Sequence, residues 1–231
     1  MPTGPWLPAL RITQHAFADL LRTADPGAPV PACAPWTVTD LVLHLANTHR
    51  WAAGMAAGGS EDEDDAVGPR DPDALRRYYD DAAAHLRATL DRLGPDFPAR
   101  TLNGPGPASF WHRRQLHETL VHLDDLATAT ARPQPVTDPL LWSDTVDEVV
   151  TVLTPRQLRL GRIAPLGATL TLHATDTGRR WTLGTAGPAA TVTADARTLA
   201  LLLWRRTELS GPELTGDRRA ADLLLTAALT P

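Results

Sequence analysis

The chain has 231 residues, enough for one large domain or two modest ones with a real hydrophobic core. Hydrophobic residues make up 43% and charged residues 21%, which is ordinary for a soluble globular protein. The formal net charge of −5 argues against a general nucleic-acid-binding protein, which normally carries a basic face.

No apolar run approaches the ~18 residues that span a membrane. The N-terminal stretch MPTGPWLPALR also lacks the basic-then-apolar pattern of a signal peptide. We therefore expect a soluble cytoplasmic protein with no membrane and no nucleic-acid partner. All 22 basic residues are arginine, which excludes a lysine Schiff base, a lysine general base and a P-loop lysine.

Cys33 is the only cysteine, which excludes an internal disulfide, a cysteine-cluster zinc site and a CxxC redox pair. It lies in VPACAPW, flanked by prolines and with no histidine nearby in the sequence. This context favours a partly buried or merely tolerated thiol over a nucleophile. If the protein performs thiol chemistry, we expect the thiol to come from outside the chain.

The first part of the chain shows helical periodicity in four segments, separated by proline-rich and glycine-rich connections. The four predicted helices span residues 6–23, 37–55, 71–94 and 108–131. Thr37 or Thr39 is the predicted N-cap of the second helix. The acidic stretch EDEDD at 61–65 is predicted to be a solvated loop. Four helices with long connections indicate a helical bundle, in which sites form between facing helices.

Another helical segment is predicted at 140–153, and after it the hydrophobic pattern changes. ATLTLHATD, RRWTLGT and AATVTAD alternate polar and apolar residues, which predicts strands, and helices are predicted at 196–206 and 216–229. We therefore predict an α+β protein: a four-helix bundle over 1–160 and a small α+β domain over 161–231.

The fourth predicted helix carries three ionisable side chains within two turns, in HETLVH. Glu118 and His122 are four residues apart and so project from one stripe. His44 lies in the middle of the second helix, away from its apolar stripe. One histidine from one helix and a Glu/His pair from another form a ligand set suited to catalytic zinc, with one position open. On the pattern alone, hydrogen-bonded core histidines and a surface glutamate remain an alternative.

Two blocks, WTVTDLVLHLANTHRW and FWHRRQLHETLVHLDDL, resemble the mycothiol-dependent maleylpyruvate isomerase family of the DinB-like helical-bundle superfamily. The resemblance implies that His44, Glu118 and His122 bind the metal. The C-terminal pattern also resembles the family's small domain, where an apolar helix ends in Gly-Arg and Gly-Asp follows. Here Gly216 and Asp217 match, but Trp204 stands where the family usually has the glycine.

The resemblance implies a zinc-dependent enzyme that uses a low-molecular-weight thiol, mycothiol in the reference reaction, to isomerise maleylpyruvate. Binding of a thiol to zinc favours the thiolate, which adds to the activated double bond, lets it rotate and is then expelled. S-transfer onto another small electrophile is the related activity. The arginine-only composition suits the GC-rich actinobacteria that make mycothiol. A His2Glu set would also accept nickel, iron or manganese.

Other ionisable residues are candidates for supporting roles in this reaction. Arg205, or the adjacent Arg206, is a candidate for reaching an anionic substrate from the small domain, and His117 is a candidate acid or base. Arg113 and Arg114 are candidates for binding the cofactor or a substrate carboxylate. The site is expected to open toward a cleft between the two domains.

Two alternatives belong to other classes of protein. One is a DinB-like biosynthetic enzyme with a metal-assisted reaction that needs no thiol. The other is a non-catalytic binding or accessory protein that has kept the fold. The electrophile and the oligomeric state do not follow from the sequence.

Overall fold

The computed structural model describes residues 6–59 and 68–231, so the acidic stretch at 61–65 lies outside the described residues. The chain divides into two compact units, Met1–Val136 and Thr137–Pro231. Within the described residues, no helix is long and apolar enough to cross a membrane. Helices dominate the first unit and a small sheet with helices forms the second, so the predicted α+β class is confirmed.

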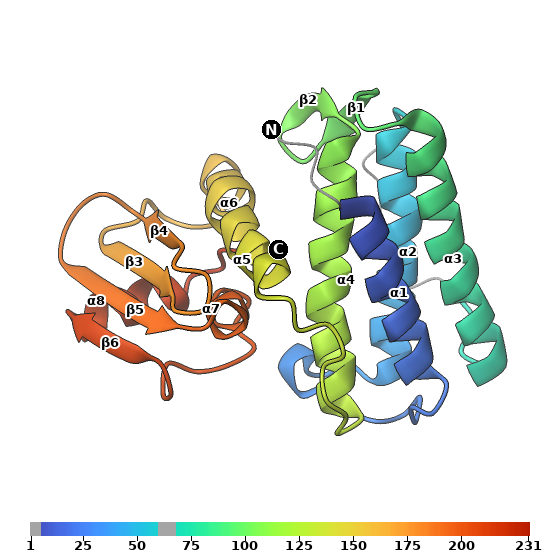
Figure 1. Cartoon of the computed structure of the whole chain (residues 1–231), viewed down its shortest axis with the longest axis horizontal. Coiled ribbons are helices and arrows are strands. Elements are labelled where there is room, and N and C mark those ends of the chain that lie inside the picture. Colours follow the sequence, from blue (N-terminus) through green and yellow to red (C-terminus); the bar gives the residue numbers. More distant parts are fainter. Residues whose placement is uncertain (1–5, 60–67) are drawn as a thin grey trace. The chain divides into compact units, whose positions relative to one another are not determined.

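The first unit is the predicted helical bundle (Figure 1). Its helices are α1 (Trp6–Leu21), α2 (Val38–Ala56), α3 (Pro72–Leu93) and α4 (Ser109–Ala129). Helix α2 packs against α3 and α4, and α1 packs against α3 and α4, which closes the bundle around one core. The largest fully buried side chains of this core include Phe17, Tyr79 and Trp111.

Local capping explains where α2 and α3 begin. The Thr37 side chain accepts a hydrogen bond from the Asp40 backbone N–H, and the Asp40 carboxylate accepts one from the Thr37 backbone N–H. This capping box satisfies two donors that a helix start otherwise leaves without partners. Asp71 caps α3 in the same manner through the N–H of Ala74, and Pro72 occupies the first turn.

A closed loop precedes α2 and is called here the 30–37 loop. It contains one turn of 3-10 helix, Pro31–Cys33. The backbone N–H of Val30 donates to the carbonyl of Trp36 at 2.9 Å, and the N–H of Trp36 donates to the carbonyl of Cys33 at 3.0 Å. These bonds hold Cys33 and Trp36 in fixed positions at the start of the helix that carries His44.

A short antiparallel hairpin, β1 (Pro98–Thr101) and β2 (Gly104–Pro107), lies between α3 and α4. The sequence does not predict this hairpin, because PARTLNGPGP shows no polar–apolar alternation. The hairpin is secured by side-chain contacts instead. The indole N–H of Trp111 donates to the carbonyl of Arg100, and the Thr101 hydroxyl donates to the carbonyl of Gly104.

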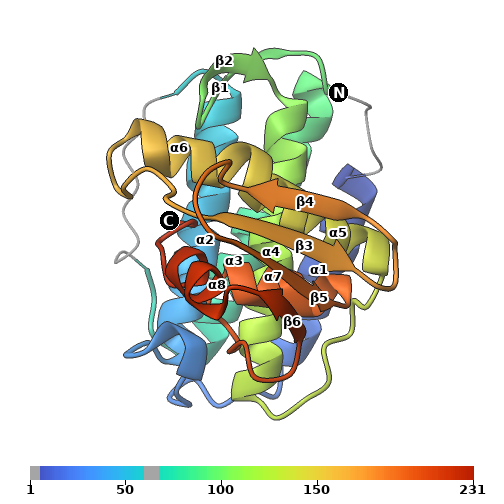
Figure 2. The ribbon, with the colours of Figure 1, turned by 90° about the vertical axis from the view of Figure 1, so that its left-hand side faces the viewer.

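The second unit has a four-stranded sheet in the order β4-β3-β5-β6, seen side by side in Figure 2. The strands are β3 (Thr169–Ala174), β4 (Arg180–Leu183), β5 (Ala189–Ala194) and β6 (Glu213–Gly216). β3 and β5 are parallel, and the other pairs are antiparallel. Helices α7 (Ala196–Leu203) and α8 (Arg218–Leu225) pack on this sheet. β6 was not predicted, since only Leu214 and Thr215 are available to alternate.

The second unit begins earlier than the boundary near residue 160 that we inferred from the sequence. Helix α5 (Pro139–Glu148), a π turn (Val149–Leu153) and α6 (Thr154–Arg159) run on from one another. Helix α5 packs against α7, and the π turn contacts β4, so this helical stretch belongs with the sheet. Pro155 follows the π turn and has no backbone N–H to donate, which is a known cause of an irregular turn in a helix.

Candidate metal centre

Helices α2 and α4 bring the side chains of His44, Glu118 and His122 together. The Nε2 atoms of His44 and His122 both lie 3.2 Å from the same atom, Oε1 of Glu118. The candidate ligand atoms of these three residues all lie within 4.8 Å of one another. The two imidazole rings are 5.0 Å apart, centroid to centroid, in an edge-on arrangement.

The local sequence explains this convergence. Glu118 and His122 are one helical turn apart on α4 and therefore share a face. His44 is 74 positions from Glu118 and reaches it because α2 packs against α4. The stripe on α4 is buried: 7% of Glu118 and 4% of His122 are exposed to solvent. A solvated stripe with a surface glutamate is thereby ruled out.

Glu118 is held as a carboxylate in this buried position. Burial alone would raise its pKa, but the charge of Arg114 and hydrogen bonds from His122 and His44 outweigh burial. Together they hold the pKa of Glu118 well below its usual range. The guanidinium of Arg114 contacts Oε2, the oxygen that faces away from the histidines. Oε1 therefore remains directed at the two imidazoles.

His122 is oriented on its other side by Asp125, one turn further along α4. Its Nδ1 lies 2.9 Å from Oδ2 of Asp125. Burial alone would lower the pKa of His122, but hydrogen bonds to Asp125, Cys33 and Glu118 outweigh it and raise the pKa well above the usual value. These contacts favour the charged form of the imidazole, which lies between two carboxylates.

The chemistry of this cluster fits a divalent metal ion. It offers two imidazole nitrogens and one carboxylate oxygen, the donor types that zinc accepts in three-ligand catalytic sites. The Nδ1 of His122 is engaged by a carboxylate, the arrangement that leaves Nε2 to bind a metal. Arg114 offsets the charge of Glu118 without occupying Oε1.

The 30–37 loop forms one wall of this cluster. The Trp36 ring lies 4.9 Å from the His44 ring and 6.5 Å from the His122 ring, centroid to centroid. Cys33 Sγ lies 3.4 Å from Oδ2 of Asp125 and is half-buried. The sequence placed no histidine near Cys33, but the fold places the thiol beside His122, 89 positions along the chain (122 − 33).

A network of buried side-chain hydrogen bonds links the four helices next to the cluster, and the sequence did not reveal it. Gln14 donates to Nε2 of His49 at 3.0 Å, and Nδ1 of His49 donates to Oε1 of Gln115 at 2.7 Å. Arg87 donates to Oε1 of Gln14, which leaves the amide nitrogen of Gln14 to donate to His49. Burial lowers the pKa of His49 to about 4, so this histidine is neutral near pH 7.

The remaining predicted site residues are dispersed between the two units. Arg113 and His117 are buried in α4, and His117 is completely inaccessible. Arg114 pairs with Oε2 of Glu118, the oxygen that does not contact the two histidines. Arg205 belongs to the second unit, directly after the C-cap of α7, and is exposed. Its φ of 56° is left-handed, a conformation that is costly for a side chain other than glycine.

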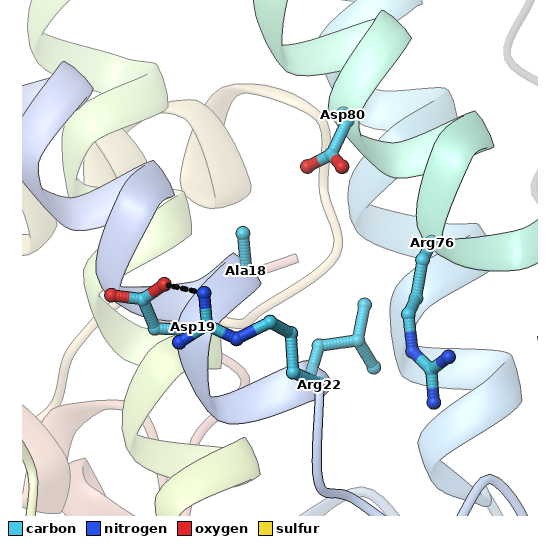
Figure 3. Close-up of a pocket in the computed structure, with 6 residues that line it drawn as sticks. Ala18, Asp19, Arg22, Arg76 and Asp80 are labelled. Atoms are coloured by element: carbon cyan, nitrogen blue, oxygen red, sulfur yellow. Dashed lines mark ion pairs between the residues drawn. The ribbon is translucent and has the colours of Figure 1, made fainter. Parts of the chain in front are cut away.

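A small surface pocket lies elsewhere, between α1 and α3 (Figure 3). It is lined by Ala18, Asp19, Leu21, Arg22, Arg76 and Asp80. Asp19 and Arg22 pair with each other at 3.0 Å, and Arg76 pairs with Asp73 at 2.7 Å. The pocket contains none of the residues of the metal cluster, and its exposed ion pairs do not define a binding chemistry.

Comparisons with known proteins agree with the fold. A family model described as the mycothiol maleylpyruvate isomerase N-terminal domain matches residues 8–127, and the corresponding C-terminal domain model matches residues 141–223. The chain resembles a crystal structure of the mycothiol-dependent maleylpyruvate isomerase, with a TM-score of 0.70 and 17% identity over 93% of each chain. It resembles a histidine-to-alanine mutant of that isomerase similarly, with a TM-score of 0.69, 16% identity and 93% coverage of each chain. No curated protein matches the sequence.

Proposed function

The chain belongs to the mycothiol maleylpyruvate isomerase family, and on this premise we propose that it is a metal-dependent enzyme acting with a low-molecular-weight thiol. Its reaction is the isomerisation or S-conjugation of a small electrophilic metabolite, with mycothiol as the thiol and zinc as the metal. The observation that carries the proposal is the approach of both histidine Nε2 atoms to one buried carboxylate oxygen.

A bound zinc ion would supply Lewis acidity that favours the thiolate form of an approaching thiol near neutral pH. The protein's own residues prepare the site for this. Arg114 keeps Glu118 ionised and turned toward the histidines. Trp36 packs beside the two imidazoles from the 30–37 loop. The nucleophilic sulfur comes from the co-substrate, since the one cysteine of the chain is engaged with Asp125.

An arginine at the end of α7 is the proposed anchor for an anionic substrate, and the backbone favours Arg206 over Arg205. The left-handed position after a helix end is where glycine is preferred. Here Arg205 takes that conformation, and the N–H of Arg206 bonds back to the carbonyl of Leu201 at 2.8 Å. On this ground we assign the family's Gly-Arg pattern to Arg205–Arg206 in place of Trp204–Arg205.

This assignment predicts opposite outcomes for two neighbouring substitutions. Arg205→Gly is expected to raise the free energy of unfolding by about 1 kcal/mol, because glycine relieves the left-handed strain, and to leave turnover intact. Arg206→Ala is expected to raise KM for an anionic substrate by at least about tenfold, as loss of a charge-assisted contact does. Thermal unfolding and steady-state kinetics check both. Loss of turnover in Arg205→Gly with normal turnover in Arg206→Ala would reverse the assignment.

The metal content of the purified chain tests the proposed function directly. Elemental mass spectrometry on protein prepared without chelator or polyhistidine tag is expected to find about one zinc ion per chain. His44→Ala, Glu118→Ala and His122→Ala are each expected to lose it, because two ligands alone hold zinc weakly. His85→Ala, which removes an exposed histidine on α3, is the matched control and is expected to retain the metal.

Circular dichroism would establish that each variant remains folded. A wild-type chain that takes up no zinc when the ion is supplied would contradict the proposal. With the metal in place, turnover of maleylpyruvate that depends on mycothiol identifies an isomerase. Accumulation of a thioether product identifies an S-transferase. Turnover that persists after the thiol is removed would contradict the thiol-dependent mechanism.

A further inference from the structure

We propose that Asp125 is a positioning residue for His122, and that Cys33 holds the Asp125 carboxylate in place for this task. The inference rests on the proposed function, because the position it secures is that of a metal ligand. Asp125 is not one of the three candidate ligands His44, Glu118 and His122, and it acts through the imidazole.

The geometry selects one tautomer of the neutral imidazole. Oδ2 of Asp125 lies 2.9 Å from Nδ1 of His122, and the carboxylate can only accept, so Nδ1 carries the proton. In the neutral ring, Nε2 then presents its lone pair, and this atom faces Oε1 of Glu118 at 3.2 Å. Without Asp125, the ring can carry its single proton on Nε2, where it blocks metal binding.

Burial makes the orientation specific. Asp125 is 2% exposed and His122 is 4% exposed, so water competes little for this hydrogen bond. The two residues are three positions apart on α4, which places the carboxylate within reach of the ring without any long-range contact. A carboxylate behind a ligating histidine fixes the ring orientation and raises its basicity as a ligand.

Cys33 connects the same carboxylate to the 30–37 loop. Its Sγ lies 3.4 Å from Oδ2, the oxygen that also accepts from His122. The thiol is a weak donor, so its contribution is to restrict the rotation of the carboxylate. The contact spans 92 positions of sequence, which ties the loop bearing Trp36 to the helix bearing His122.

The zinc affinity of the full chain, measured by competition with a chromophoric chelator, tests this role. Asp125→Ala is expected to weaken zinc binding by about 10–100-fold, the usual effect of losing such a partner. Asp125→Asn retains a side-chain oxygen that accepts from Nδ1 and is expected to recover most of the lost affinity. Asp124→Asn alters the adjacent buried aspartate and is the matched control, expected to keep the wild-type affinity. Cys33→Ala removes the weak donor that restricts the Asp125 carboxylate, so it is expected to weaken zinc binding by up to about fivefold, less than Asp125→Ala does.

A second measurement needs no variant. In the zinc-loaded wild-type chain, long-range 1H–15N spectra of the histidine rings are expected to show His122 protonated at Nδ1. Protonation at Nε2 would overturn the inference, and so would a folded Asp125→Ala variant whose zinc affinity equals that of wild type. A wild-type chain that binds no zinc would instead overturn the proposed function together with this inference, so the two failures are distinguishable.

Discussion

Replacing Arg114 by alanine is expected to lower the free energy of unfolding by about 3–5 kcal/mol, the usual cost of removing one partner from a buried ion pair. The side chains of Arg114 and Glu118 are 5% and 9% exposed, so the carboxylate left behind would remain buried without its main compensating charge. Its pKa is now held well below the usual range by Arg114 and the two histidines. Without the guanidinium, burial would favour the protonated acid.

Urea denaturation of the full chain, followed by tryptophan fluorescence in the presence of a chelator, measures this loss without interference from metal binding. Adding Glu118→Gln to Arg114→Ala is expected to restore part of the stability, because no buried charge then lacks its partner. Arg114→Lys, which retains the charge but not the planar fork, is expected to fall between wild type and alanine. A loss below about 1 kcal/mol would mean that the pair behaves like an exposed salt bridge.

The second large effect is the pH dependence that His49 gives to the free energy of unfolding. Its pKa falls from the ordinary value of 6.5 to about 4 in the folded chain, chiefly through burial. The unfolded chain therefore binds one proton more than the folded chain between these pH values. The free energy of unfolding decreases as the pH falls through this window, by about 3 kcal/mol from this residue alone.

His49→Gln removes the titrating group while keeping a polar side chain between Gln14 and Gln115. This variant is expected to be less stable than wild type near pH 7, and its deficit is expected to shrink by about 3 kcal/mol by pH 4. The difference between the two stability curves isolates His49, since all other groups titrate in both proteins. A deficit that stays constant between pH 7 and pH 4 would show that His49 is not held neutral by burial.

Local chemistry accounts for the parts of the fold that the sequence predicted well. Helix α2 begins where Thr37 and Asp40 form a capping box, and both residues are visible in the sequence three positions apart. β3 was predicted because polar and apolar residues alternate in its sequence. The burial of its side chains alternates along the strand in the same way. The hairpin at Pro98–Pro107 escaped prediction because one of the two contacts that secure it comes from Trp111, which lies outside it.

The same difference between local and long-range contacts applies to the candidate site. Glu118 and His122 are four residues apart, so their shared face follows from helical geometry, whereas the participation of His44 was implied by family resemblance. The Arg114–Glu118 pair is also four residues apart and could have been inferred from spacing. The contacts Cys33–Asp125 and His49–Gln115 span 92 and 66 positions, and they depend on how the helices pack. No periodicity in a single segment encodes them.

The separation of the candidate ligands along the sequence also affects how much folded protein a living cell maintains. His44 and Glu118 are 74 positions apart, so an unfolded chain cannot present the three donors together, and the proposed ion binds only the folded bundle. At a free metal concentration 100 times the Kd, such binding adds about 2.7 kcal/mol to stability by mass action. Scarcity of the ion would then reduce the population of folded molecules that escape proteolysis, as well as the activity of each molecule.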